Sequence, residues 1–538
     1  MPATPHSVGK RFSALPIAWC TRLEPGRVGL ALALLWAAMT MWNFGLPGLH
    51  MDEANHYAFI PGMKSESVAR LHHYRLPDNY LDRRDDLMQF PILGGSVYNS
   101  PITAYLGFPY FAMAGHSVAS LRIFSALIGL ATILSLAVLV GRIFGWPAAL
   151  LAGTIIATDP THVFSVRSQG VPFWPVVLFW ALAANFLLTA FRSREPSVWP
   201  LIAGGAALGL SVMAYFVGIF MALPLVLAAF IMLRRRPVHL AAFVLAGLLA
   251  YSPMIYALIS IHVSNPDLLR NFGMPDWTAR PSISAFSIEN LARLKTITLG
   301  ALGDHDFATW ITGHVAIDLT VPRMLAFALA AGLVILIGFQ RRETPARQRV
   351  FYGLFGAILA LYFSGLFFLK ATSLHHLLPI TILAATACAG AVAAPGFVRL
   401  IATAICSLLI ASNLMVLNAA HNRLVETGGR GYHNESYSLV SPLLADRLAE
   451  YHPVFAGWGF HLQFLFLTDG RVPYSFVGSP RIDRIDQLLT RHDRLAVVVP
   501  TADRETIANA FVAEQELRFA QRNEIQLFSV FLLSTRQN

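Results

Sequence analysis

Two adjacent carboxylates, Asp52 and Glu53, follow a long apolar segment in the stretch LPGLHMDEANHYAF, residues 46–59. A carboxylate at the border of a membrane is costly to keep there, so the pair is a candidate functional site. One carboxylate could accept the proton of an attacking hydroxyl, while the other orients the acceptor or helps to hold a metal ion. Consecutive side chains point in different directions, so we expect the two to have different roles. The alternative is a pair of solvated loop residues.

Other polar side chains lie near the ends of apolar runs and could bind a phosphate. Lys370 could hold a lipid phosphate as a point charge, and Arg167 could do the same. His375 and His376 are adjacent, so the pair is expected to supply at most one metal ligand, or a donor to a phosphate. The alternatives are a snorkelling lysine and histidines that cap a membrane span.

A dense charge cluster, LDRRDD, occupies residues 81–86 of the region after the first apolar run. Arg83 or Arg84 could reach a lipid phosphate from this cluster. The alternative is a solvated face of the loop.

The elements that position these residues are predicted to be membrane helices. Hydrophobic types make up 55% of the 538 residues and charged types only 13%, and the mean hydropathy is +0.56. A soluble domain usually carries about 25% charged residues. Apolar runs of about 17–22 residues recur and are typical of a polytopic helical membrane protein. We expect about 11 spans, at residues 28–46, 119–141, 145–160, 171–191, 199–216, 218–233, 238–260, 322–339, 350–369, 375–393 and 398–417.

The basic residues predict which way the chain crosses the membrane. They fall on alternate loops, and such loops are cytoplasmic in most membrane proteins. The N-terminal segment 1–27 is basic and is placed on the same side, whereas loops 47–118 and 261–321 and the tail 418–538 are placed outside. The net charge of +10 is mainly this signal, and no nucleic-acid partner is expected because no basic patch carries interleaved aromatic residues.

The tail is predicted to be a small α/β domain outside the membrane. HPVFAG and RLAVVVP have the composition of short buried strands. ADRETIANAFVAEQ has the pattern of an amphipathic helix, with Thr501 or Asp503 as its cap. LRFAQRNEIQLFSVFLL is typical of two strands around a polar turn.

Five stretches resemble, in order, the GT-C membrane glycosyltransferases. The likeness is greatest to the branch that contains protein O-mannosyltransferases and the lipid A aminoarabinose transferase. The stretches are DEANHYAF after the first span, YNSPITAYLGFPYFAMAGHSVASLRIFSALIGLATILSLAVLVGRIFG with its arginine-led second span, ATDPTHVFSVRSQG, SLHHLLPITILAA and GWGFHLQFLFLTDGRV. Together they extend over most of the chain.

The resemblance implies a sugar transferase of the cytoplasmic (inner) membrane with an inverting mechanism. The donor would be a polyprenyl-phosphate-linked sugar, and the acceptor a lipid, a glycan or a protein on the outer face. Asp52 would be the general base, and Glu53 would orient the acceptor or a divalent metal cation, with His376 as a second possible ligand. The expected substrate contacts are Tyr57, Tyr98, Asn99, Arg83, Arg84, Arg167, Lys370, His375 and His376.

The chain also departs from the pattern of this branch. Asn99 and Ser100 stand where a histidine often precedes the prolines, and no second acidic residue follows Arg167 near Pro172. A histidine pair replaces the late arginine–tyrosine. A secondary transporter or flippase, in which the acidic pair binds protons or ions, therefore remains an alternative, as does a non-catalytic envelope assembly protein on the same fold. Transporters more often show paired repeats and ionisable residues at span midpoints.

Overall fold

The structure is a computed structural model, and it describes the chain in several stretches. These are residues 24–57, 102–168, 170–192, 195–264, 288–302, 307–313, 345–368, 374–394, 396–522 and 525–535, with isolated positions 315, 324, 328 and 332. Among the predicted site residues, Arg83, Arg84, Tyr98, Asn99 and Lys370 lie outside the described residues, and so does most of the predicted span 322–339.

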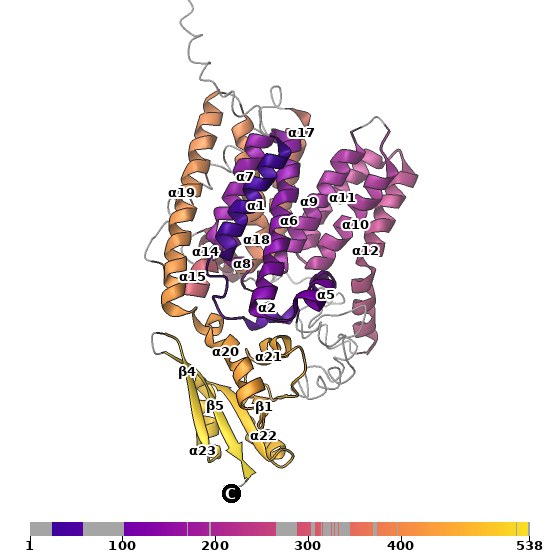
Figure 1. Ribbon diagram of the computed structural model, residues 1–538. Coiled ribbons are helices and arrows are strands. Elements are labelled where there is room, and N and C mark those ends of the chain that lie inside the picture. Colours follow the sequence, from indigo (N-terminus) through magenta and orange to yellow (C-terminus); the bar gives the residue numbers. More distant parts are fainter. Residues whose placement is uncertain are drawn as a thin grey trace, which may run out of the picture.

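The described helices form a bundle with a small α/β domain at one end (Figure 1). Each predicted span other than 322–339 coincides with a helix of the bundle. These helices are α1 (Pro25–Met41), α6 (Val118–Phe144), α7 (Trp146–Thr158), α9 (Phe173–Ala190), α10 (Val198–Ala214), α11 (Gly218–Leu233), α12 (Pro237–Ser264), α17 (Ala346–Phe368), α18 (Leu378–Gly390) and α19 (Gly396–Thr427).

Six segments of the described chain are long and apolar enough to cross a membrane. They are α6, α9, the first 20 residues of α12, α17, α18 with the preceding 3-10 turn η6 (Leu374–Leu377), and α19. The predicted multi-pass helical membrane protein is confirmed, whereas the predicted number of 11 spans is not. The last helix, α19, continues to Thr427, past the predicted end of its span at residue 417.

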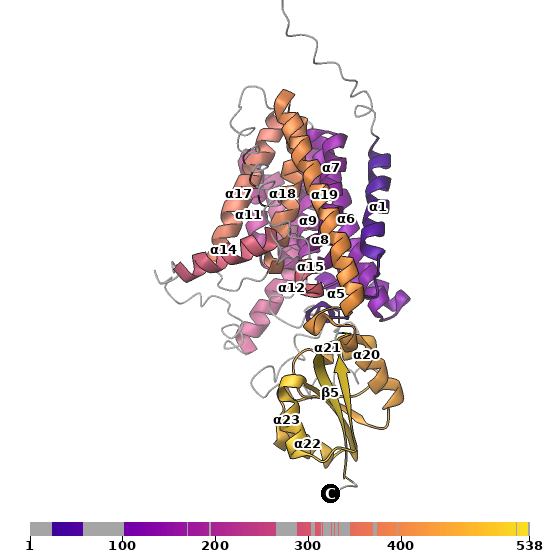
Figure 2. The same cartoon turned by 90° about the vertical axis from the view of Figure 1, so that its left-hand side faces the viewer.

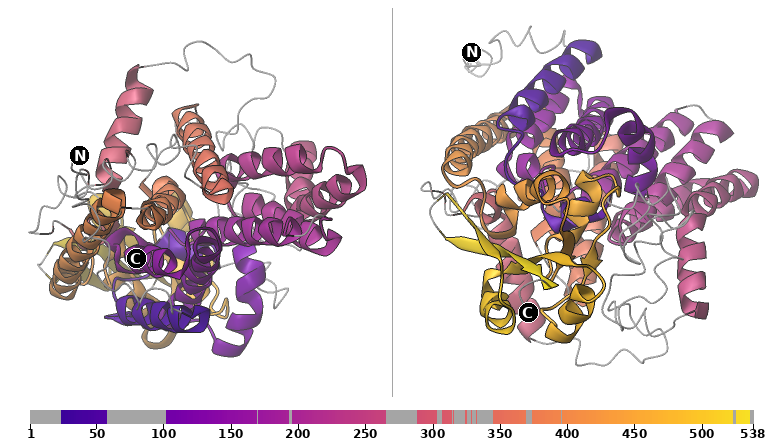
Figure 3. Two further views of the ribbon diagram at one scale, coloured as in Figure 1. Left: turned by 90° about the horizontal axis from the view of Figure 1, so that it is seen from above. Right: turned by 60° about the horizontal axis from the view of Figure 1, so that its bottom comes forward.

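Small residues let the first helices of the bundle approach closely, as is common where helices pack in membranes. A Cβ at Gly129 of α6 would lie 2.5 Å from the Trp36 ring of α1, and one at Gly153 of α7 would lie 2.5 Å from Leu32. Helices α10, α11 and α12 lie on the opposite side of the bundle from α1 and α19 (Figure 3). Helix α14 (Ile288–Leu302) lies across the bundle, near its end next to the α/β domain (Figure 2).

The α/β domain contains a five-stranded sheet with the strand order β2-β1-β3-β5-β4. The first three of these strands are parallel, and β5 is antiparallel to both of its neighbours. The bounds are β1 (His452–Phe455), β2 (Ser475–Phe476), β3 (Arg494–Pro500), β4 (Gln515–Ala520) and β5 (Gln526–Ser534).

The predicted strands of this domain are confirmed as β1, β3, β4 and β5, while the two-residue strand β2 was not predicted. The predicted helix is confirmed as α23 (Arg504–Ala510), but it ends earlier than expected, because Gln515 already belongs to β4. Asp503 occupies its N-cap position without a capping hydrogen bond from its side chain. Helix α22 (Ile482–Leu489) was not predicted.

The described segment that follows α1 packs against this domain. Short helix α2 (Met51–Asn55) packs against α21 (His461–Leu467). Leu49 and Tyr57 share one hydrophobic cluster with Phe466 of α21. The Leu49 amide donates to the Ser438 hydroxyl of α20 (Ser436–Pro442) at 2.7 Å. The acidic pair is therefore held between the bundle and the α/β domain.

Candidate functional site

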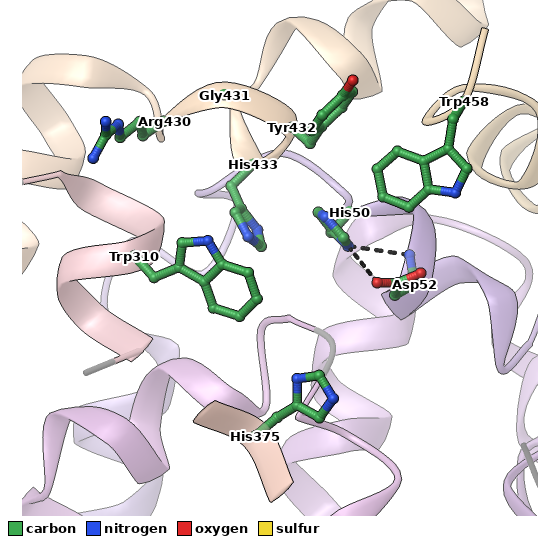
Figure 4. A pocket seen from close by; sticks show the side chains of 9 residues that line it. All are labelled: His50, Asp52, Trp310, His375, Arg430, Gly431, Tyr432, His433 and Trp458. Atoms are coloured by element: carbon green, nitrogen blue, oxygen red, sulfur yellow. Dashed lines mark hydrogen bonds and ion pairs between the residues drawn. The ribbon is translucent and has the colours of Figure 1, made fainter. Parts of the chain in front are cut away.

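A cavity of about 570 Å³ lies at the junction of the bundle and the α/β domain. Its volume is within the range of small-molecule sites, about 300–1,000 Å³. Segments far apart in the sequence form its walls: the segment after α1, α15 (Phe307–Thr312), η6, the connection after α19 and the turn after β1 (Figure 4). The lining residues are His50, Asp52, Trp310, His375, Arg430, Gly431, Tyr432, His433 and Trp458.

Asp52 lies on this cavity, as expected for a reacting carboxylate. Its side chain is 42% exposed toward the cavity, but protein surrounds the carboxylate on its other sides and reduces its hydration. This desolvation raises the pKa of Asp52 to about 6. No donor to its carboxylate is assigned among the described residues. The carboxylate is therefore mostly ionised at neutral pH and able to accept a proton.

His50 caps the short helix that carries Asp52. Its Nδ1 accepts a hydrogen bond of 3.1 Å from the Asp52 amide and so caps the N-terminus of α2. An accepting Nδ1 places the ring proton on Nε2. Burial lowers the pKa of His50 to about 3, so the ring is neutral. The 3.8 Å approach of Nδ1 to the Asp52 carboxylate is therefore not an ion pair.

Glu53 points away from the cavity into the protein. It is completely buried, and its Oε1 accepts from Nε of Arg122 at 3.3 Å. The Arg122 guanidinium also donates to the carbonyls of Phe44 and Gly48, at 3.0 and 3.3 Å. Burial raises the pKa of Glu53, and Arg122 opposes that rise. The two carboxylates thus have different environments, as expected, but Glu53 anchors the loop and does not line the cavity.

Arg167 is engaged with the end of the first helix. It is 1% exposed, and its guanidinium donates to five backbone carbonyls in and just after α1. These belong to Met39, Thr40, Trp42, Asn43 and Leu46. The last carbonyls of a helix have no partner within the helix, and a guanidinium can satisfy several of them. This geometry gives Arg167 a structural role, and phosphate binding by this residue remains a prediction.

The other predicted contacts divide between the cavity and the core. His375 lines the cavity. His376 is buried, with its Nε2 3.4 Å from the Tyr215 hydroxyl. Tyr57 is fully buried and packs edge-on against Phe111 and Phe124. Of these three residues, only His375 can meet a ligand without a rearrangement.

Several lining residues were not predicted from the sequence. His50 precedes the acidic pair, and Arg430, Gly431, Tyr432 and His433 belong to the glycine-rich segment GGRGYHN that follows the last span. A glycine-rich segment between a span and a soluble domain is a signal that could have been noticed. Trp458 lies in GWGF, which was singled out only as the start of the outer domain.

The predicted divalent metal cation has no ready site among the residues that the structure describes. They include no group of three or more histidine, cysteine or acidic side chains placed to hold a metal ion. Glu53, one of the two expected ligands, already accepts from Arg122, and His376 lies next to Tyr215. No chemical step is therefore assigned to a metal ion.

Comparisons with known proteins agree with this architecture. The family model described as dolichyl-phosphate-mannose-protein mannosyltransferase matches residues 99–258. ArnT from Cupriavidus metallidurans in the apo state aligns with a TM-score of 0.50 and 14% identity, over 94% of this chain and 97% of that chain. The Archaeoglobus fulgidus oligosaccharyltransferase tethered with an acceptor peptide aligns with a TM-score of 0.50 and 11% identity, over 90% of this chain and 70% of that one. No curated protein matched.

These likenesses define the class of the fold. The chain shares its fold with these solved structures, and the alignment with ArnT extends over 94% of the chain. The predicted fold class and the predicted resemblance to the O-mannosyltransferase and ArnT branch are both confirmed.

Proposed function

We propose that this protein is a membrane glycosyltransferase that moves a sugar from a polyprenyl-phosphate donor to an acceptor hydroxyl at the outer face of the membrane. The observation that carries the proposal is Asp52, an ionised carboxylate on a cavity at the border between the helical bundle and the outer domain. The matching family model is described by a transferase with a lipid-phosphate sugar donor.

Asp52 is assigned the role of general base. The acceptor hydroxyl attacks the anomeric carbon of the donor, and Asp52 takes the hydroxyl proton as the new carbon–oxygen bond forms. The bond between the anomeric carbon and the phosphate oxygen breaks, and the electron pair leaves with the polyprenyl phosphate. Attack from the face opposite the phosphate inverts the anomeric centre. His50 keeps the carboxylate in position through the Asp52 amide.

The leaving phosphate needs positive charge, and Arg430 supplies it from the cavity wall. Its side chain is exposed, and no partner for the guanidinium is assigned among the described residues. Its backbone is anchored, since the Arg430 amide donates to the Ile311 carbonyl at 2.8 Å. A guanidinium can bind two phosphate oxygens at once. Lys370 remains a further candidate for the same phosphate.

The orientation in the membrane follows from the position of the basic loops. Arg142 lies in the last turn of α6, and Arg192 directly follows the C-cap of α9. Both helices run away from the α/β domain toward the far end of the bundle (Figure 1). With that end cytoplasmic, the N-terminus is inside and the outer domain is outside the cytoplasmic membrane. The cavity then faces the compartment in which the acceptor is found.

The test is sugar transfer by the full chain reconstituted in lipid vesicles. A panel of polyprenyl-phosphate sugars is offered with an envelope extract, and Asp52→Asn is compared with wild type. We expect a loss of about 100-fold or more, which is typical of removing a general base. Asp446→Asn, at an exposed site in the outer domain, is the matched control. Equal rates for wild type and Asp52→Asn would exclude Asp52 as the base, and donor binding without turnover in wild type would identify a non-catalytic protein.

A further inference from the structure

One wall of the cavity carries partly exposed aromatic side chains. This wall is formed by the outer domain and by its connection to α19. Trp458 is 42% exposed and Tyr432 is 37% exposed, and both line the cavity. Their rings meet nearly at a right angle, with centroids 4.9 Å apart and an interplanar angle of 87°. They form a corner with two flat apolar faces.

This corner lies next to the proposed base. The Trp458 ring contacts His50 edge-on, with centroids 5.7 Å apart. His50 in turn holds the Asp52 amide at 3.1 Å. A ligand stacked on Trp458 is therefore within a short reach of the Asp52 carboxylate (Figure 4).

His433 adds polar groups without charge to the same wall. Its side chain is 3% exposed, it points between Trp310 and His50, and neither ring nitrogen has a hydrogen-bond partner among the described residues. Burial holds the pKa of His433 well below its usual value, so the ring is neutral, with one donor and one acceptor nitrogen. Buried polar groups are normally paired, so two unpaired nitrogens on a cavity indicate a ligand.

We infer that this corner is the acceptor subsite and that the acceptor is a glycan. A pyranose ring has an apolar face of C–H groups, which suits Trp458 and Tyr432, and a rim of hydroxyls, which suits His433 and Asp52. One hydroxyl of the stacked sugar is thereby presented to the base. The inference deepens the proposed transferase function and rests on it for the identity of the site.

Other acceptor classes fit this wall less well. An extended peptide is usually recognised by pairing with a free strand edge, and no described strand lines the cavity. Arg430 is the one arginine or lysine among the described lining residues, and it is assigned to the donor phosphate, so the described wall offers no further cation for an anionic lipid acceptor. The aromatic corner and the neutral imidazoles favour a neutral, hydroxyl-rich ligand.

The local backbone is built to present Trp458. The following residue, Gly459, has a φ of +106°, which disfavours other residues. A Cβ on Gly459 would also lie 2.8 Å from the Tyr432 ring. The turn and the Tyr432 ring therefore require a glycine at position 459, directly after Trp458.

The test measures binding directly, so that it does not depend on transfer. Neutral trisaccharides of glucose, mannose and N-acetylglucosamine are added to the full chain in nanodiscs, and binding is followed by saturation-transfer NMR. We expect at least one of them to bind, and Trp458→Ala to weaken binding about 3- to 10-fold, as for loss of one stacked aromatic contact. Trp458→Phe should restore part of the affinity, and Trp199→Ala, at a side chain 74% exposed on α10, should change nothing.

The outcomes separate the two proposals. The glycan subsite is overturned if no trisaccharide binds, if Trp458→Ala binds as well as wild type, or if a serine- and threonine-rich peptide binds in its place in a Trp458-dependent manner. Asp52→Asn should keep trisaccharide binding while losing transfer. Trisaccharide binding in a protein that never turns over any donor would leave the subsite standing and refute the transferase.

Discussion

The buried ion pair between Glu53 and Arg122 provides the sharpest test of how the acidic loop is held. Both side chains are at most 1% exposed, and the pair links the segment after α1 to the start of α6. Replacing Glu53 with glutamine keeps the shape but leaves the guanidinium of Arg122 without a compensating charge. Breaking a buried pair in this way costs about 3–5 kcal/mol, a large share of the roughly 5–15 kcal/mol that stabilises a typical folded protein.

The matched control is the exposed pair of Arg423 and Glu426, whose atoms are 3.0 Å apart and whose side chains are 43% and 63% exposed. Exposed pairs contribute about 0–1 kcal/mol, so Glu426→Gln should have little effect. Unfolding is followed by tryptophan fluorescence as sodium dodecyl sulfate is titrated into mild-detergent micelles. The reasoning is refuted if Glu53→Gln costs no more than Glu426→Gln.

A double-mutant cycle separates the charge effect from general packing. The double variant Glu53→Gln with Arg122→Met contains no isolated charge. It should therefore lose less stability than the sum of the two single variants, because contacting residues couple by about 0.5–3 kcal/mol. Strict additivity would show that the two side chains stabilise the loop independently.

Three further predictions follow from the described contacts. Gly48→Ala should lower both stability and transfer, because the new Cβ would lie 1.9 Å from the Asn434 carbonyl oxygen. Gly45→Ala is the control and should be neutral, since nothing lies within 4 Å of a Cβ built there. Thermal inactivation and initial transfer rates of both variants check this prediction. The transfer rate should fall as the pH drops through about 6, because the raised pKa of Asp52 leaves the base protonated below that value; a pH–rate profile without an acid limb near 6 would contradict the assignment. In the α/β domain, the Arg504 guanidinium lowers the pKa of Glu516 to about 2, from an ordinary value of about 4.5. The stability from this pair is therefore present above pH 4.5 and is lost as the pH falls toward 2, so acid unfolding monitored by circular dichroism should show a smaller loss over this range in Glu516→Gln than in wild type.

Much of the architecture could be predicted because it depends on local patterns. A span is recognised from about 20 consecutive apolar residues, whatever it later packs against. The strands β3 and β5 are recognised in the same way, from short apolar runs bounded by polar residues. Asp52 could be selected because a carboxylate at a membrane border is rare and costly. These inferences hold because a segment that is buried in lipid or in a core must be apolar along its whole length, and this is visible in the sequence.

The partners of the candidate site residues could not be predicted in this way. Arg167 has the sequence pattern of a phosphate ligand, but the structure places its guanidinium on the carbonyls at the end of α1. Glu53 has the pattern of a second reacting acid, but Arg122, 69 positions later in the chain, buries it. The residue type of a charged side chain does not show whether its partner is a ligand, a backbone carbonyl or another charged side chain.

The sequence by itself determined a membrane-embedded helical bundle, a C-terminal α/β domain and one carboxylate worth testing. Only the tertiary structure decided that His50, Trp310, Arg430, His433 and Trp458 line one cavity together with that carboxylate. The physical reason is that hydrophobicity acts along each segment, whereas a binding site depends on contacts between segments that packing alone brings together. His50 and His433 stack with ring centroids 4.3 Å apart, and neither segment has a sequence pattern that predicts this contact with the other.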